Sequence, residues 1–311
     1  MPVLAVRHAT TYRYRQPVGL GEHRLMLRPR DAHDQRLLDF ALDVTPAPAE
    51  TRWASDPFGN LVTLLRFAGR ARELRIVSRL RVDHRPAGPP DGRIAPHART
   101  WPFSYDADEA PDLGRCVERR HRDPGRAVDA WARRFVREGG PTDTARLLAD
   151  MTAAVRRDFT YLVREERGVQ EPRDTLRLGS GTCRDFAVLM MEAARSLGLA
   201  ARFATGYLHH PAGRSRVGGG ATHAWVQVYL PGPGWVEYDP TNAIADGRDL
   251  VRVAAVRDPA QAVPVSGSWT GFAGDALGMD VEVSVAAEGD EDDDEDATVP
   301  RATGTTDGAG G

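Results

Sequence analysis

The chain of 311 residues contains no lysine, only two cysteines and no long hydrophobic segment. All 41 basic residues are arginine, which we attribute to codon usage rather than to function. Cys116 and Cys183 are too few to build a disulfide framework, and neither belongs to a C-x-x-C pair that would indicate a structural zinc site. We therefore expect reduced thiols and no metal or other cofactor.

The sequence also lacks the segments that direct a chain to a membrane. No apolar run reaches the roughly 18 residues of a transmembrane helix, and the first residues lack the basic-then-apolar pattern of a secretory signal. These absences predict a cytoplasmic protein without membrane contact. Its 41% hydrophobic and 27% charged residues are typical of a globular protein, and its length suffices for two domains of roughly 150 residues.

Charge is distributed unevenly along the chain. Residues 288–311 hold nine acidic residues against Arg301, so this tail carries −8 and residues 1–287 carry +5 of the net −3. A charge of +5 spread over a large body is not the clustered basic face of a nucleic-acid-binding protein. The tail cannot bury enough apolar surface to offset its ordering entropy, so we predict disorder. It is expected to solubilise the protein; a protein-binding or weak calcium-binding tail is the alternative.

Three ordered regions precede the tail. Residues 1–85 alternate loosely between apolar and polar, with a turn signal at 56–60, and predict an antiparallel β-sandwich. Residues 86–123, rich in proline and glycine, predict a connector. Residues 124–287 begin with helical periodicity, including a helix that Thr142 is expected to cap, and predict a catalytic core. The expected fold class is α+β.

A first segment with chemical potential is G-S-G-T-C-R-D-F-A at 179–187. From Cys183 onward apolar residues recur every three or four positions until Gly198, which predicts a helix with Thr182 as its N-cap. Unpaired N–H groups and the helix dipole favour an anion at this end, so they favour a thiolate and can stabilise an oxyanion. A cysteine taken alone is more often a small buried hydrophobe.

Two further segments supply a histidine and an aspartate. Residues 222–230 predict a strand beginning at His223, and residues 234–239 predict a strand that ends at Asp239 before a proline. The intervening Pro-Gly-Pro predicts a hairpin. We expect a register that pairs His223 with Asp239, and Val228 with Gly234 across a five-residue loop. Both catalytic candidates then share one face, which is expected to line a cleft.

These three side chains suffice for nucleophilic catalysis. A neutral imidazole can take the proton of a thiol, or form an ion pair with the thiolate, and later protonate a leaving amine. A carboxylate on the second ring nitrogen fixes the tautomer and stabilises the imidazolium. Each residue has an ordinary structural explanation, but their combination with a helix start and a hairpin favours a Cys183–His223–Asp239 triad.

The motifs resemble the core of bacterial transglutaminase-like proteins. The resemblance is carried by G-S-G-T-C-R-D-F-A, by L-G-L-A-A-R-F-A-T-G-Y-L at 197–208 and by T-H-A-W-V-Q-V-Y-L-P-G-P-G-W-V-E-Y-D-P-T-N at 222–242. H-A-T-T-Y-R-Y-R-Q-P-V at 8–18, with L-R-P-R and D-P-F-G-N, resembles the β-rich N-terminal region that accompanies this core. The resemblance implies a papain-like fold, in which a helix bearing Cys183 packs on an antiparallel sheet bearing His223 and Asp239.

The resemblance leaves several activities open. We favour a cysteine peptidase or amidase that hydrolyses a peptide or protein substrate. Cross-linking by transamidation, or a non-catalytic peptide-binding module of the same fold, is the alternative. A metal enzyme using His209, His210 and His223 is disfavoured, because adjacent histidines on a strand point to opposite faces. Tyr161 is suggested as a second oxyanion donor, and the oligomeric state is not predicted.

Overall fold

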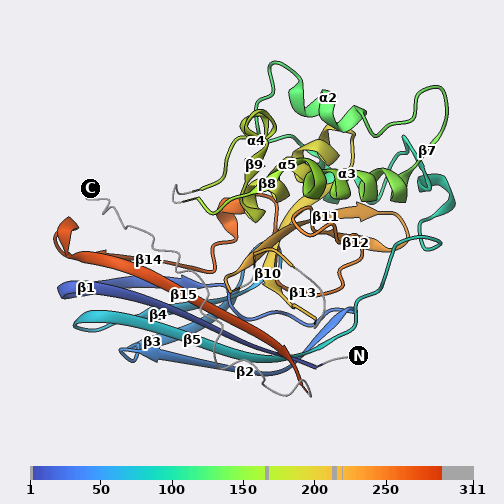
Figure 1. The fold of residues 1–311 in the computed structure, drawn as a ribbon. Coiled ribbons are helices and arrows are strands. Elements are labelled where there is room, and N and C mark those ends of the chain that lie inside the picture. Colours follow the sequence, from blue (N-terminus) through green and yellow to red (C-terminus); the bar gives the residue numbers. More distant parts are fainter. Residues whose placement is uncertain (1–2, 165–167, 212–215, 219, 289–311) are drawn as a thin grey trace.

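The computed structural model describes residues 3–164, 168–211, 216–218 and 220–288. The acidic tail predicted from residue 288 onward thus lies, apart from Glu288, outside the described residues. Two antiparallel sheets form successive layers, and the helices cover the outer face of the smaller sheet (Figure 1). The predicted α+β class is confirmed. None of the described helices is long and apolar enough to cross a membrane.

The larger sheet has seven strands: β1 (Val3–Leu25), β2 (Gln35–Thr45), β3 (Glu50–Ser55), β4 (Leu61–Arg66), β5 (Arg70–His84), β14 (Val265–Thr270) and β15 (Ala276–Ala287). Strand β1 is shared along its length. Its first half lies between β5 and β15, and its second half lies between β4 and β14. Both halves of β1 contribute to one apolar cluster that includes Leu25, Leu65 and Leu74. These strands therefore form one curled sheet, in place of the two stacked sheets of the expected sandwich.

The curl brings the two ends of this sheet together. Strands β2 and β3 are the outermost strands of the order β2-β5-β1-β4-β3. Nevertheless, the rings of Phe40 on β2 and Trp53 on β3 are 5.9 Å apart, and the Arg28 guanidinium lies 5.5 and 5.3 Å from their centroids. Right-handed twist accumulates from strand to strand, which explains how such a sheet curls until its ends meet.

The last two strands change the expected division of the chain. Sequence analysis placed residues 124–287 in one catalytic unit, whereas β14 and β15 pair with β1 and thus belong to the N-terminal sheet. Strand β15 runs antiparallel to β1 from Leu4↔Ala287 to Tyr14↔Ala276. It covers the edge of β1 that would otherwise expose a long row of unpaired backbone groups.

The smaller sheet has the order β12-β11-β10-β13 and carries the candidate site. Its strands are β10 (Ala201–Leu208), β11 (His223–Leu230), β12 (Gly234–Tyr238) and β13 (Leu250–Val256). The helices are α1 (Ala110–Val117), α2 (Ala127–Arg133), α3 (Thr144–Asp158), α4 (Pro172–Leu178) and α5 (Cys183–Ser196). Two short strand pairs lie in the segments that flank the helices: β6 (Thr100–Trp101) pairs with β7 (Thr142–Asp143), and β8 (Thr160–Tyr161) pairs with β9 (Ser180–Gly181).

Helix α5 is the central element of this layer and is buried along most of its length. It packs against β11, and the core between them contains Ala224, Val226 and Val228 from the sheet. Helix α3 differs from the prediction at its start. Its N-cap is Asp143, whose carboxylate accepts from the Arg146 N–H at 2.8 Å, rather than Thr142.

The two sheets are joined by an apolar and a polar interface. Leu4, Val6, Leu80 and Val82 of the larger sheet pack against Tyr207, Val251 and Val253 of the smaller one. The buried Asn60 side chain accepts from the N–H of Ala255 at 3.0 Å and donates to its carbonyl at 2.9 Å. Because Ala255 lies on β13, this amide continues the hydrogen bonding of the smaller sheet into the N-terminal part of the molecule.

Candidate active site

The N-terminus of helix α5 places Cys183 at the first helical position, as the sequence predicts. Thr182 is the N-cap, and its hydroxyl accepts from the Asp185 N–H while the Asp185 carboxylate accepts from the Thr182 N–H at 2.8 Å. This reciprocal capping box begins the helix at Cys183. A Cβ at Gly181 would lie 2.9 Å from that of Asp185, so the last residue of β9, just before the N-cap, requires glycine.

Asp185 also holds the neighbouring loop, which sequence analysis did not identify. Its fully buried carboxylate accepts from Arg164 Nε at 2.9 Å and Nη2 at 3.0 Å, and from the Gln170 N–H at 2.7 Å. These charge-assisted hydrogen bonds hold the Arg164 side chain and the backbone at Gln170 in place beside helix α5. The sequence signal was the spacing T-x-x-D, which is that of a capping box.

His223 and Asp239 meet as predicted. His223 Nε2 lies 2.8 Å from Asp239 Oδ2, and both side chains are buried. The Asn242 side-chain amide donates to the same oxygen at 2.9 Å, and the Thr241 N–H donates to Oδ1 at 2.8 Å. Sequence analysis missed both donors, although they follow in the same D-P-T-N motif. The carboxylate is therefore held in one orientation toward the ring.

The pair stabilises its own charged form. Burial opposes the charge of His223, but the Asp239 carboxylate and the neighbouring Cys183 outweigh it and raise the pKa of the imidazole to about 10. Burial likewise acts to raise the pKa of the Asp239 carboxyl, but the charge and hydrogen bond of His223, with Asn242 and Thr241, lower it overall. An imidazolium–carboxylate pair is the expected state near neutral pH.

The other ring nitrogen of His223 is not used by Asp239. His223 Nδ1 is buried and has no hydrogen-bond partner within the described part of the chain. Cys183 and His223 both line a small pocket of about 170 Å³, and the thiol influences the imidazole directly. Catalytic hydrogen bonds are often long in a free enzyme and tighten when substrate binds. The geometry thus brings all three predicted side chains to one place.

Tyr161 lies at the same site. A Cβ at Gly218 would be 3.1 Å from His223 Nδ1 and 3.5 Å from the Tyr161 hydroxyl, which places ring nitrogen and hydroxyl around the same point. Strand β8, which ends at Tyr161, runs parallel to β9 just before Cys183. Burial, together with the charges of Cys183 and Asp239, raises the pKa of the phenol. Its role as an oxyanion donor stays a prediction.

Comparisons with known proteins give the same architecture. Residues 4–83 match the bacterial transglutaminase-like N-terminal region, and residues 129–240 match the transglutaminase-like superfamily. An uncharacterized protein of Mycobacterium tuberculosis strain H37Rv is 31% identical over 289 residues, covering 89% of this chain and 91% of its own length. An uncharacterized protein of Mycobacterium leprae is 27% identical, covering 90% and 98%.

This chain belongs to the bacterial transglutaminase-like family. The crystal structure of a candidate cysteine protease from Cytophaga hutchinsonii has the same fold, with a TM-score of 0.67, 21% identity, and coverage of 96% of this chain and 93% of that one. The superfamily match encloses Cys183, His223 and Asp239. The resemblance inferred from the sequence motifs is therefore confirmed at the level of family and fold.

The hairpin of this transglutaminase-like core has a different register from the predicted one. Val226 pairs with Tyr238 and Leu230 with Gly234, so the strands are shifted by two residues and the loop has three residues instead of five. A shift of two preserves the faces, so His223 and Asp239 still meet, as diagonal neighbours. Gly234 at φ +78° follows the tight loop, a left-handed position typical of three-residue hairpins.

Packing against the connector supports this loop. The Ala95 N–H donates to the Pro231 carbonyl at 2.8 Å, and a Cβ at Gly232 would lie only 2.3 Å from the Arg93 carbonyl oxygen. The backbone of the connector thus approaches the turn as closely as glycine allows.

The face of the hairpin that was expected to line a cleft is buried instead. Trp225 and Gln227 donate to the Glu237 carboxylate, which also pairs with Arg252, and Arg252 pairs in turn with Asp34. Burial raises the pKa of Glu237 despite Arg252. The prediction of an open cleft on this face is therefore wrong, because the side chains of Arg252 and Asp34 occupy it. His223, at the end of the strand, lines the small pocket.

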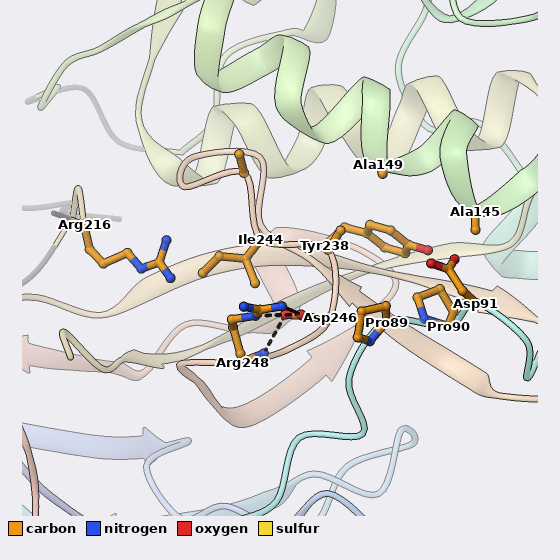
Figure 2. Close-up of a pocket in the computed structure, with 12 residues that line it drawn as sticks. Pro89, Pro90, Asp91, Ala145, Ala149, Arg216, Tyr238, Ile244, Asp246 and Arg248 are labelled. Atoms are coloured by element: carbon orange, nitrogen blue, oxygen red, sulfur yellow. Dashed lines mark hydrogen bonds and ion pairs between the residues drawn. The ribbon is translucent and has the colours of Figure 1, made fainter. Parts of the chain in front are cut away.

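A larger pocket of about 630 Å³ lies beside helix α3 (Figure 2). It is lined by residues on either side of Asp239 along the chain, Tyr238 and Ala243–Asp246, and by Ala145 and Ala149 of α3, but not by Cys183 or His223. Figure 2 shows the Tyr238 hydroxyl directed toward Asp91. Size alone would favour this larger pocket, whereas the chemistry favours the small pocket at Cys183.

The described residues offer no metal site. Among them, no group of three or more histidine, cysteine, aspartate or glutamate side chains is arranged to hold a metal ion. His209 donates its backbone N–H to Asp249, and its neighbour His210 has a pKa lowered by burial and then by the charge of His223.

Proposed function

We propose that this protein is a thiol-dependent enzyme that cleaves amide bonds of a peptide or protein substrate, with Cys183 as nucleophile, His223 as acid–base and Asp239 as its orienting carboxylate. The observation that carries the proposal is the buried His223–Asp239 pair, whose histidine lines one pocket together with Cys183 at the capped start of α5. Fold and family alone do not fix the chemistry, since one fold supports many activities.

The proposed reaction follows from the geometry. The Cys183 sulfur attacks the amide carbonyl while backbone N–H groups at the start of α5 stabilise the oxyanion. The carbon–nitrogen bond breaks, His223 gives its proton to the leaving amine, and a thioester remains on the sulfur. Water then attacks the thioester, His223 takes its proton, and the carboxylic acid leaves with Cys183 regenerated. An amine in place of water gives transamidation.

The decisive experiment follows the thioester. Intact-mass spectrometry of the protein incubated with peptide libraries should show acyl adducts on the wild type and none on Cys183→Ala. Turnover of any peptide found in this way should fall by roughly 1,000-fold or more in that variant. Cys116→Ala is the matched control and should behave as the wild type. Adducts that persist in Cys183→Ala would overturn the assignment.

The same assay separates the alternatives. With a primary amine added, hydrolysis yields the free acid and transamidation yields the amide. Because the chain has no lysine, none of its own side chains can serve as the acceptor amine. A non-catalytic binding module predicts no adduct and equally slow alkylation of Cys183 and Cys116 by iodoacetamide.

A further inference from the structure

The candidate pocket contains an arginine that lacks a carboxylate partner. Arg184 follows the nucleophile, is partly buried and lines the pocket together with Thr205 and Thr222. Its guanidinium lies 5.0 Å from the centroid of the Phe203 ring, and Nη2 donates to the Pro259 carbonyl at 3.0 Å. Arg184 forms no ion pair with any of the described residues. Its position is thus fixed by a ring and a neutral carbonyl.

The second arginine of the pocket shows the contrast. Arg164 donates through two nitrogens to the Asp185 carboxylate, so its charge is balanced within the protein. A guanidinium has five N–H donors, and the described protein uses one nitrogen of Arg184. Neither Nε nor Nη1 of Arg184 belongs to the buried polar atoms without partners, so neither is sealed and unpaired inside the described protein.

A guanidinium that is not paired with a carboxylate in a confined site favours an anionic ligand. Burial lowers the pKa of Arg184, while the neighbouring charges of Cys183 and Asp185 act to raise it. The planar fork of arginine matches a carboxylate in two parallel hydrogen bonds. The Asp185 carboxylate does not serve, since it is already occupied by Arg164, Gln170 and Thr182.

We propose that Arg184 binds a carboxylate of the substrate next to the scissile amide, so that the preferred acyl donors are acidic. This inference rests on the proposed function, because it names the substrate class of the same site. An acidic side chain or a free α-carboxylate near the scissile bond supplies the required group. Arg184 thereby selects the substrate, and Cys183 performs the chemistry.

Iodoacetate and iodoacetamide test this without a known substrate, because they differ in little except carboxylate against carboxamide. The ratio of their alkylation rates at Cys183, followed by peptide mass spectrometry, measures anion binding beside the sulfur. We expect Arg184→Gln to lower this ratio by roughly tenfold, the effect of losing a charge-assisted hydrogen bond. The ratio at Cys116 in the same sample should not change.

Arg177→Gln is the control for net charge. It removes one positive charge from α4, where Arg177 is 67% exposed, and should leave the Cys183 ratio as in the wild type. Arg184→Lys keeps the charge, loses the fork and should give an intermediate ratio; it replaces Arg184→Gln if thermal melting shows that the glutamine variant does not fold. An unchanged ratio in a folded Arg184 variant, or an equal fall in Arg177→Gln, overturns the proposal.

The outcome is separable from the proposed function. Slow alkylation of wild-type Cys183 by neutral iodoacetamide, no faster than Cys116, contradicts the catalytic assignment. The ratio of the two reagents can be measured at any absolute rate, so the role of Arg184 is tested in either case.

Discussion

The imidazole of His223 is surrounded by groups that favour its protonated form. Asp239 lies 2.8 Å from Nε2, and Cys183 is a second neighbour that favours the charged ring. Such a ring can protonate a leaving amine, and its charge is compensated before substrate arrives. The same compensation makes the folded state bind a proton more tightly than the unfolded chain does, which links the site to the stability of the protein.

This linkage predicts a pH dependence of stability. The pKa of His223 is raised to about 10 from an ordinary value near 6.5, so its contribution is complete below pH 6.5 and is lost as pH rises toward 10. The free energy of unfolding should fall across this window by up to about 1.4 kcal/mol per pH unit. Urea denaturation at several pH values measures the slope.

His223→Gln should remove that slope, because the imidazole that titrates is gone. Asp239→Asn should reduce the slope, because the Asp239 carboxylate no longer raises the pKa of His223 while Cys183 still does. His97→Gln, at a histidine on the connector, is the control and should keep the wild-type slope. A slope that is identical in His223→Gln contradicts the assigned ion pair.

At the scale of elements, the start of helix α5 is the part on which the site depends. Thr182 and Asp185 fix the first turn, and through Arg164 and Gln170 the same carboxylate fixes the loop beside the pocket. The capping box therefore determines where the sulfur lies, where the helix N–H groups point and how the pocket is bounded. The buried Asp185 carboxylate thus links the helix start, the adjacent loop and the boundary of the pocket.

Asp185→Ala should thus be far more damaging than an ordinary cap removal. It removes the buried carboxylate to which Arg164, whose side chain is 17% exposed, donates through two nitrogens, so we expect a loss of about 3 kcal/mol in unfolding free energy. Asp174→Ala is the matched control: it removes a first-turn acid of α4 whose ion pair with Arg177 is exposed, and should cost under about 1 kcal/mol. Equal losses in urea denaturation would show that Asp185 has no special role.

At the scale of the whole molecule, the N-terminal sheet is the support of the smaller sheet. It packs on β10 and β13 through Tyr207, Val251 and Val253, and its strand β15 reaches the loop before His223, where the Val283 N–H donates to the Gly220 carbonyl at 3.1 Å. The chain crosses between the sheets twice, because β14 and β15 return to β1 (Figure 1). We therefore expect the two sheets to unfold together.

Asn60→Ala tests this coupling. Loss of the buried amide leaves the N–H and carbonyl of Ala255 without partners and should cost about 2 kcal/mol. The midpoints followed by tryptophan fluorescence and by alkylation of Cys183 in denaturant should shift together. Thr51→Ala on the exposed strand β3 is the control and should shift neither. Separate transitions for the two probes would contradict a single cooperative unit.

The sequence by itself determined the local features of this protein. The helix start at Cys183, the sharing of one hairpin face by His223 and Asp239, and the family followed from residue order alone, because caps, alternation and motifs are properties of neighbouring residues. Only the tertiary structure decided the hairpin register, the return of β14 and β15 to β1, and the isolation of Arg184 beside the sulfur. Each of these depends on segments distant in sequence: Arg93 against the turn at Gly232, β1 beside β15, and Pro259 and Phe203 around the guanidinium. Such contacts are set by how whole layers pack, which no local pattern records.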